Sequence, residues 1–313
     1  MSVLKGAKIL LGPSTFAAKD PAPLDHLREE GAEIIDNPYK RRLTKEELMG
    51  LLTQGVTGLI AGLEPIDREV MEQSNLKVIS RCGAGTSNVD LQAAKELGIK
   101  VCYTPYGPTT AVAELTVAAL LDLLRSLSIM NHALHRGEWT KITGHQLEGK
   151  TVAIVGFGRI GRKLATLLIP FGVTVLAADV DTSDPMEGVE FCPLEDALRR
   201  ADVVSLHVSG NEEIIRKKTF DQLKDGVILL NAARGEVINE EGLIEALEKG
   251  KVRGVWMDTF VDEPYSGPLR QYPQALLTPH VGSYTVEGRK KMEMDTVINL
   301  IEAFKESCDH VGY

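Results

Sequence analysis

The stretch TVAIVGFGRIG at residues 151–161 decides the fold of this 313-residue chain. An apolar run predicts a buried strand at its start, and three glycines then follow in the spacing G-x-G-x-x-G. A helical pattern begins directly after the last glycine, so the glycines form the turn between a strand and a helix. In that context the spacing is typical of a turn that binds dinucleotide phosphates, because the backbone and the helix N-terminus offer amide donors.

Each glycine has a separate physical role in such a turn. Gly156 allows the tight turn, Gly158 lets the backbone approach a pyrophosphate, and Gly161 lets the helix pack closely on the strand. Asp179 ends the next predicted strand, eighteen residues after Gly161. A carboxylate there accepts hydrogen bonds from ribose hydroxyls and repels a 2′-phosphate, so the sequence predicts NAD rather than NADP. Asp181 is a competing candidate for the same role.

On both sides of this turn, apolar strand patterns alternate with amphipathic helical patterns, including helices predicted over 218–226 and 286–304. Such alternation predicts parallel β/α units. The pattern starts afresh at residue 151, and the length exceeds what one core normally supports, so we expect an α/β fold of two lobes with a cleft between them. The predicted strands lie at 7–11, 58–62, 77–81 and 99–103 in the first block, and at 151–155, 173–179, 202–208, 227–233, 253–258 and 274–278 in the second.

The composition narrows the possible classes of function. The chain is 43% hydrophobic and 25% charged, with a net charge of −9 and a pI of about 5.4. This balance argues against nucleic acid or an anionic membrane as a general partner. Four scattered cysteines form neither a C-x-x-C pair nor a zinc spacing, and no signal peptide or membrane span is predicted. We therefore expect a cytoplasmic protein without a metal site.

Three polar motifs follow predicted strands of the second block, where doubly wound sheets bind ligands. NAARGEVIN supplies Arg234, DTFVDEP supplies Asp258 and Glu263, and LLTPHVGSYT supplies His280. Such a set suits the reduction of a 2-keto acid. An arginine fork can hold the carboxylate, an imidazolium can protonate the keto oxygen as hydride arrives, and a carboxylate can orient the imidazole. Taken singly, Arg234 could form a surface ion pair, Glu263 could be a solvated loop acid, and His280 could be an ordinary loop histidine. Their occurrence together after strands of one nucleotide-binding block favours catalysis.

These motifs, together with RCGAGTSNVD at residues 81–90, resemble those of the D-isomer-specific 2-hydroxyacid dehydrogenases. Within that family the chain is most similar to the D-3-phosphoglycerate dehydrogenase branch, over essentially its whole length. The resemblance implies a Rossmann-type doubly wound NAD-binding domain over 105–285, inserted in a flavodoxin-like substrate domain formed by 1–104 and 286–313. It also implies a homodimer through 110–150.

The resemblance further implies roles for individual residues. Arg234 would bind and polarise the substrate, and His280 with Glu263 would form the acid–base pair. The substrate-binding residues would be Arg81, Gly83, Ala84, Arg234 and His280. The cofactor-binding residues would be Val112, Gly156, Gly158, Arg159, Ile160, Gly161, Asp179, His207, Ala233, Asp258 and Gly282, with Asp258 positioning the nicotinamide carboxamide.

The implied reaction interconverts a D-2-hydroxy acid and its 2-keto acid, and 3-phosphoglycerate with 3-phosphohydroxypyruvate of serine biosynthesis is the favoured pair. One departure counts against it: the loop AGLEP at 61–65 lacks the arginine that phosphoglycerate dehydrogenases often carry there. Arg81 is retained, and Lys40, Arg41 and Arg42 could replace the missing ligand or form a solvated basic turn. Glyoxylate, hydroxypyruvate or another unphosphorylated acid is therefore the alternative.

Two further expectations follow from the resemblance. The sequence stops after the last helix of the first lobe, so we expect a short form without the serine-sensing regulatory domain of longer relatives. A different class of function is an NAD(H)-sensing, corepressor-like binding protein, because such relatives keep the same catalytic residues.

Overall fold

The computed structural model describes residues 2–308, which form two compact units. Among the described residues, unit 1 comprises 2–108 and 283–308, and unit 2 is Thr109–Gly282. Met1 and residues 309–313, which the sequence analysis assigned to the substrate domain, lie outside the described residues. The expected boundaries, 104/105 and 285/286, fall within four residues of the places where the packing divides the chain.

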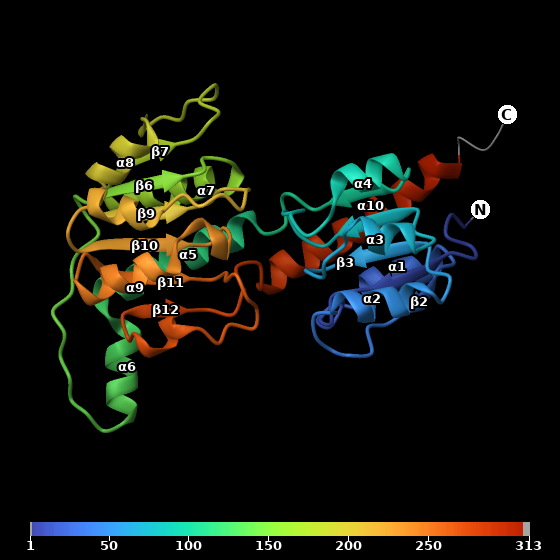
Figure 1. Cartoon of the computed structure of the whole chain (residues 1–313), viewed down its shortest axis with the longest axis horizontal. Helices are drawn as coiled ribbons and strands as arrows, with labels where there is room; N and C mark the ends of the chain where they lie inside the picture. The colour runs from blue at the N-terminus through green and yellow to red at the C-terminus, as the bar shows by residue number, and fades with distance from the viewer. Residues whose placement is uncertain (1, 309–313) are drawn as a thin grey trace. The chain divides into compact units, whose positions relative to one another are not determined.

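Unit 1 is built on a five-stranded parallel sheet in the order β2-β1-β3-β4-β5 (Figure 1). β3 and β4 are buried throughout, as near-continuous apolar runs predict for parallel strands covered on both faces. β2 was not predicted, because its three residues are only partly buried and give no clear pattern. The strands are β1 Lys8–Leu11, β2 Glu33–Ile35, β3 Gly58–Ala61, β4 Val78–Arg81 and β5 Lys100–Tyr103.

Helices cover both faces of this sheet. α1 and α10 share one core with β1 and β3, while α2, α3 and α4 pack on the opposite face. Since α10 lies against β4 and β5, the last helix joins the same unit as the first strands. The helices are α1 Ala22–Glu29, α2 Lys45–Leu52, α3 Arg68–Glu72, α4 Leu91–Glu96 and α10 Val286–Cys308.

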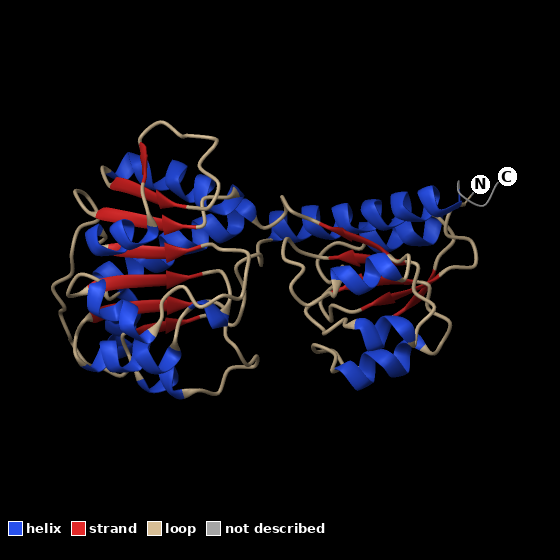
Figure 2. Ribbon diagram, turned by 45° about the horizontal axis from the view of Figure 1, so that its top comes forward, coloured by secondary structure: helices blue, strands red, loops and turns tan. Residues whose placement is uncertain are grey.

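Unit 2 contains a seven-stranded parallel sheet in the order β12-β11-β10-β9-β6-β7-β8 (Figure 1). Figure 2 draws its strands in red. From β6 the chain adds β7 and β8 on one side and then β9 to β12 on the other. The reversal between β6 and β9 is a topological switch point, where doubly wound sheets bind ligands beyond the carboxyl ends of their strands. The strands are β6 Thr151–Val155, β7 Thr174–Ala178, β8 Val189–Phe191, β9 Val203–Leu206, β10 Val227–Asn231, β11 Val252–Met257 and β12 Ala275–Leu277.

The helices of unit 2 also lie on both faces of its sheet. α5 Thr109–Arg125 and α7 Arg159–Leu168 share one core, and α8 Leu194–Arg200 and α9 Glu240–Glu248 share the other. The helix predicted over 218–226 is wrong, because Leu223 is extended and Gly226 has a φ of +75°. That segment forms a short 3-10 helix instead. The 3-10 turns are η1 Ile169–Phe171, η2 Lys217–Gln222, η3 Gly235–Val237 and η4 Pro268–Gln271.

The segment that connects α5 to β6 projects from the body of unit 2 (Figure 1). Ser126, with a φ of +53°, separates α5 from α6 Leu127–His135, and residues 136–150 then run without helix or strand.

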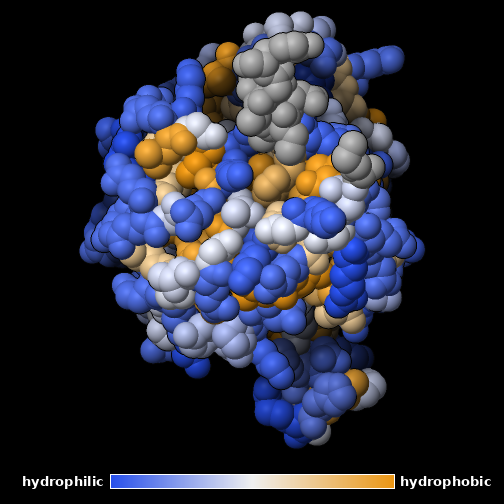
Figure 3. Space-filling model, turned by 90° about the vertical axis from the view of Figure 1, so that its right-hand side faces the viewer, coloured by the Kyte–Doolittle hydropathy of each residue, from blue (hydrophilic) through white to orange (hydrophobic). Residues whose placement is uncertain are grey.

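No helix among residues 2–308 is long and apolar enough to span a bilayer. Figure 3 shows mainly hydrophilic residues on the visible face of unit 1, with hydrophobic patches between them.

Candidate active site

The glycine turn joins β6 to α7, and two of its positions require glycine. Gly156 has a φ of +89°, and a Cβ there would lie 2.6 Å from the carbonyl carbon of His207. A Cβ on Gly161 would lie 2.4 Å from the carbonyl oxygen of Gly156, so the absence of a side chain lets α7 approach the turn.

The third glycine leaves open space at the start of α7. A Cβ on Gly158 would meet nothing within 4 Å, and no side chain caps the helix at this residue. Arg159 and Ile160 are the first residues of α7, so their amides lie at the positive end of the helix dipole. This geometry suits close approach of a pyrophosphate to the backbone.

Asp179 lies against the glycine turn, directly after β7. Its carboxylate accepts hydrogen bonds from the amides of Phe157 and Asp181. Asp181 is exposed and bonds the amide and hydroxyl of Ser183, two residues further on, which lower its pKa. Of the two acids proposed for the ribose, only Asp179 is therefore bonded to the glycine turn.

His207 follows β9 on the other side of this turn. Its Nε2 lies 2.8 Å from Oγ of Ser205, while Nδ1 is buried without a hydrogen-bond partner among the described residues. Burial lowers the pKa of His207 to about 4, because the charged ring would lose its hydration. The ring is therefore neutral at pH 7.

Asp258 lies at the carboxyl end of β11 and is buried. Its Oδ1 accepts hydrogen bonds from the hydroxyl of Thr278 at 2.6 Å and the amide of Val281 at 2.9 Å, and its Oδ2 accepts one from the amide of Gly282 at 2.8 Å. Burial raises the pKa of Asp258, and these three donors oppose that rise. Asp258 thus ties the loop that carries His280 to the sheet, a function that the sequence analysis did not identify.

Val112 joins this cluster from α5. A Cβ on Gly282 would lie 3.0 Å from Oδ2 of Asp258 and 3.1 Å from Cγ2 of Val112. The structure therefore brings together three residues that were predicted separately to border the cofactor.

His280 and Glu263 form a close pair. Nδ1 of His280 lies 3.0 Å from both carboxylate oxygens of Glu263, and the two side chains are 31% and 19% exposed. His280 has a φ of +55°, an uncommon conformation for a residue other than glycine. Glu263 also accepts a hydrogen bond from the amide of Phe260 at 3.1 Å, which fixes the carboxylate. Because Glu263 engages Nδ1, the other ring nitrogen is available to a substrate.

Arg234 follows β10 at the same edge of the sheet. Its side chain is partly buried, and Nη1 donates to the carbonyl oxygen of Ala233 at 2.7 Å. Burial lowers the pKa of Arg234, while Glu236 and Glu263 raise it. Asn231 holds the turn, because its amide nitrogen donates to the carbonyl of Arg234 and its Oδ1 accepts from the amide of Ala233.

The remaining predicted substrate residues belong to unit 1, where Arg81 ends β4 and Gly83 and Ala84 follow it. Gly83 has a φ of +147°, and its amide donates to Oγ1 of Thr104 at 2.8 Å and to the carbonyl of Arg81 at 3.0 Å. The amide of Gly83 is therefore engaged within unit 1, which the sequence analysis did not anticipate. Arg81 is buried, and its Nη1 donates to the carbonyl oxygen of Cys82. In the basic run, Lys40, Arg41 and Arg42 are all exposed, and Arg41 is paired with Glu47 at 2.6 Å.

Two residues that hold the loops of the site were not predicted from the sequence. Thr278 stands two residues before His280 and relays a hydrogen bond from the indole of Trp256, at 2.9 Å, to Asp258. Tyr265 stacks on Phe260 and donates to Glu240, which holds the loop of Glu263. Their proximity to the motifs was the only available signal. No group of potential metal-ligating side chains occurs within residues 2–308.

Comparisons with family models, protein sequences and solved structures give matches that point to the same family. The family model described as "D-isomer specific 2-hydroxyacid dehydrogenase, NAD binding domain" matches residues 117–282. A hydroxypyruvate reductase of Thermotoga maritima is 33% identical over 297 residues, which are 90% of this chain and 96% of that protein.

Other relatives carry different substrate names. A D-3-phosphoglycerate dehydrogenase of Archaeoglobus fulgidus is 32% identical over 291 residues, which are 88% of this chain but only 55% of that longer protein. The crystal structure of a glyoxylate reductase from Paecilomyes thermophila aligns with a TM-score of 0.86 at 30% identity, covering 96% of each chain.

Proposed function

The chain belongs to the D-isomer-specific 2-hydroxyacid dehydrogenases, which are NAD-dependent oxidoreductases, and from this premise we propose that Arg234, Glu263 and His280 are its catalytic residues. The observation that carries the proposal is the contact of Nδ1 of His280 with both oxygens of Glu263, at 3.0 Å. A carboxylate in this position fixes the tautomer and orientation of the ring.

The residues around the glycine turn fit NAD, because Gly158 leaves open space at the start of α7 and Asp179 lies beside it. We propose that the amides of Arg159 and Ile160 hold the pyrophosphate and that Asp179 holds the ribose. Val112, His207, Ala233, Asp258 and Gly282 would border the rest of the cofactor. When bound, NADH supplies the hydride that reduces the keto carbon.

The protein residues then supply binding and the proton. Arg234 holds the substrate carboxylate and polarises the keto oxygen through its planar fork. His280 donates a proton from Nε2 to that oxygen, so the carbonyl becomes a hydroxyl. In the oxidative direction, neutral His280 accepts the hydroxyl proton at the same nitrogen. Glu263 holds the ring through Nδ1 in both directions, so that Nε2 faces the substrate oxygen.

The test compares His280→Ala and Glu263→Gln with the native enzyme, following NADH absorbance with a panel of 2-keto acids. We expect His280→Ala to lower kcat by roughly 10²–10⁴, the usual contribution of a general acid–base group, with NADH affinity retained. Turnover close to native in His280→Ala would refute the assignment. NADH binding without turnover of any acid by the native protein would favour an NAD(H)-sensing binding protein.

For the substrate, we propose a short 2-keto acid, and two candidates have support. The pair 3-phosphohydroxypyruvate and 3-phosphoglycerate, with a role in serine biosynthesis, is supported by retained Arg81, by exposed Arg42 and by relatives with that name. Hydroxypyruvate or glyoxylate is supported by the full-length likeness to a hydroxypyruvate reductase and by the engagement of Arg41 with Glu47.

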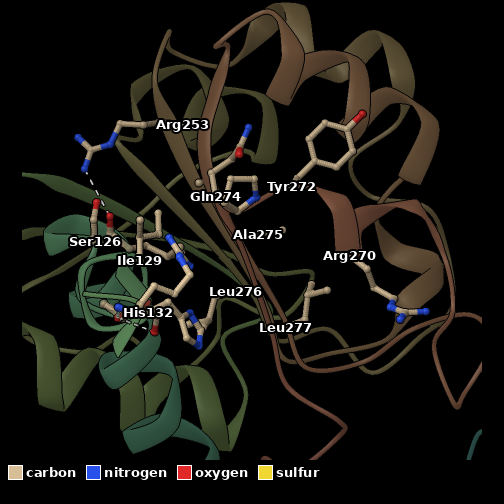
Figure 4. A pocket seen from close by; sticks show the side chains of 16 residues that line it. Ser126, Ile129, His132, Arg253, Arg270, Tyr272, Gln274, Ala275, Leu276 and Leu277 are labelled. Carbon is tan, nitrogen blue, oxygen red and sulfur yellow. Dashed lines mark hydrogen bonds between the residues drawn. The ribbon is translucent and has the colours of Figure 1, made fainter. Parts of the chain in front are cut away.

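We also propose that the protein is a homodimer through residues 110–150. Large apolar side chains are exposed along this segment, with Trp139 81% exposed. A cavity of about 610 Å³ lies between α6 and β12, lined by Ile129, His132, Leu276 and Leu277 among others (Figure 4). Exposed apolar residues beside a cavity on one segment are typical of a surface that a partner covers. The exposed apolar residues of the segment are Leu127, Leu134, Trp139 and Ile142.

Light scattering coupled to size exclusion tests the dimer. We expect the native protein to have the mass of two chains and the double variant Leu134→Ser/Trp139→Ser to have that of one. Phe171→Ser is the control, because Phe171 is an exposed apolar residue of unit 2 outside the segment. A monomeric native protein, or a double variant that stays dimeric, would contradict the proposal.

A further inference from the structure

Two stretches of unit 2 that carry residues proposed for catalysis pack against one another. The Arg234 segment, residues 231–240, runs from the end of β10 to the first residue of α9. The Glu263 segment, residues 258–265, follows β11. The two segments meet at two places, and the position of Glu263 relative to Arg234 depends on both contacts.

The first contact lies beside Arg234, where backbone packs on backbone. Gly235 is buried, and a Cβ on it would lie 2.2 Å from both the carbonyl carbon of Phe260 and the amide nitrogen of Val261. A side chain would not fit there, so glycine lets the two segments approach this closely. The amide of Phe260 also donates to Oε1 of Glu263 at 3.1 Å. Phe260 therefore links the turn of Arg234 to the carboxylate of Glu263.

The second contact is a hydrogen bond from a tyrosine to the start of α9. The hydroxyl of Tyr265 donates to Oε2 of Glu240 at 2.8 Å and accepts from the amide of Leu269 at 3.1 Å. The ring of Tyr265 stacks on that of Phe260, with the centroids 4.2 Å apart. Burial, together with the carboxylate of Glu240, raises the pKa of Tyr265 to about 12, so the hydroxyl remains a donor at neutral pH.

The chain between these contacts has little packing of its own. Val261, Asp262 and Pro264 are exposed, whereas Glu263 between them is partly buried. The contacts fall on both sides of Glu263, three residues before it at Phe260 and two residues after it at Tyr265. A loop with few buried contacts opens easily unless its ends are held. The tether at Tyr265 therefore limits how far Glu263 can move.

The position of Glu263 matters because the two segments act on one small molecule. Under the proposed function, Arg234 holds the carboxylate of a 2-keto acid, while His280, oriented by Glu263, protonates the oxygen on the neighbouring carbon. These two carbons are bonded directly, so the group that holds the acid and the group that protonates it must keep a fixed separation. A misplacement of about 1 Å can lower a rate roughly 10²-fold.

We propose that Tyr265 is a positioning residue of the acid–base pair. Through its bond to Glu240 and its stacking on Phe260, it fixes the loop of Glu263 relative to the turn of Arg234. It acts on the reaction through Glu263. This inference rests on the proposed function and deepens it, because it adds a residue outside the set proposed for catalysis.

The test measures kcat and KM for the 2-keto acid that the native enzyme reduces best, together with NADH affinity. Tyr265→Phe keeps the stacked ring but lacks the hydroxyl, and Glu240→Ala removes the acceptor of that hydroxyl. We expect each change to lower kcat about tenfold, because Glu263 is no longer held in place. KM and NADH affinity should be retained, because Arg234 and the glycine turn are unaltered. Glu240→Gln keeps an oxygen that can accept from Tyr265, so its kcat should be close to native.

Glu248→Ala is the matched control. Glu248 ends α9 and accepts a hydrogen bond from the hydroxyl of Tyr272 at 2.7 Å. The variant removes the same kind of bond from the same helix, but far along the chain from the Arg234 segment. Its kcat should therefore stay native.

A double-mutant cycle separates positioning from a general loss of structure. If Tyr265 acts through Glu263, Tyr265→Phe should change the residual kcat of Glu263→Ala by less than about twofold. An equal loss of kcat in both backgrounds would overturn the inference, because a folding defect acts in either. Native kcat in Tyr265→Phe, or a kcat as low in Glu240→Gln as in Glu240→Ala, would overturn it too. Native kcat in Glu263→Ala would instead overturn the proposed function.

Discussion

Acidification should destabilise unit 2 through the buried histidine His207. The pKa of His207 is about 4 in the folded protein, against 6.5 for an unperturbed imidazole. Between these values the unfolded chain binds more protons than the folded one, so the free energy of unfolding falls as the pH falls. The stabilisation is fully present above pH 6.5 and is lost as the pH falls towards about 4.

The size of the effect follows from the two pKa values. Each pH unit between them contributes about 1.4 kcal/mol, so the whole effect is roughly 3 kcal/mol. About 2 kcal/mol of it should be lost between pH 7.5 and pH 5. That is a large part of the stability of an ordinary domain.

Urea unfolding followed by tryptophan emission measures this effect in unit 2 alone. Both tryptophans, Trp139 and Trp256, belong to unit 2, and Trp256 is fully buried. His207→Asn removes the titrating ring, and His26→Asn in α1 of unit 1, outside the proposed dimer segment, is the control. The carboxylates titrate in all three proteins and cancel in the difference.

We expect the native protein and His26→Asn to lose about 2 kcal/mol more than His207→Asn between pH 7.5 and pH 5. An equal loss in all three proteins would refute the reasoning, because it would mean that His207 titrates alike in the folded and unfolded states.

Three further outcomes can be measured on the same protein. Gly161→Ala places a Cβ 2.4 Å from a backbone oxygen, so we expect NADH affinity to fall at least tenfold, and affinity within twofold of native would contradict the packing described. Asp179→Ser removes the carboxylate beside the glycine turn, so the preference for NADH over NADPH should shrink; a native preference for NADPH would sink that assignment. Asp258→Asn leaves at least one buried donor of the His280 loop without an acceptor, so we expect about 1–3 kcal/mol of destabilisation together with a lower kcat, and native kcat would show that the loop is held by other contacts.

The glycine turn was predictable because its information is local. Strand, spacing and helix lie within residues 151–168, and the φ of Gly156 and the close approach at Gly161 follow from that short stretch. The short strands β2 and β8 were missed because three residues carry too little apolar pattern. The segment 218–226 has a helical pattern, but its backbone becomes extended at Leu223.

The sequence predicted which residue types form the site, but not the hydrogen bonds that hold them in place. His280, Glu263 and Arg234 stand in recognisable motifs, whereas the bonds from Asp258 to Thr278, Val281 and Gly282 depend on how two loops meet. The same limit applies to unit 1. The sequence shows that AGLEP lacks an arginine, but not that Glu64 of this loop is buried, because the room for its carboxylate depends on Gly12, which is distant along the chain.

The residues proposed for the chemistry and those implied for the substrate lie in different segments of the chain. Every residue proposed for proton transfer or cofactor binding lies in the uninterrupted segment Thr109–Gly282, whereas Arg81, Gly83 and Ala84, which the resemblance implies for the substrate, lie in the flanking segments. Redox chemistry and substrate choice can therefore be recombined between relatives by a graft with only two joints. The second joint follows His280 by two residues, so a working chimaera must keep the anchored turn around that histidine intact while everything beyond it is exchanged.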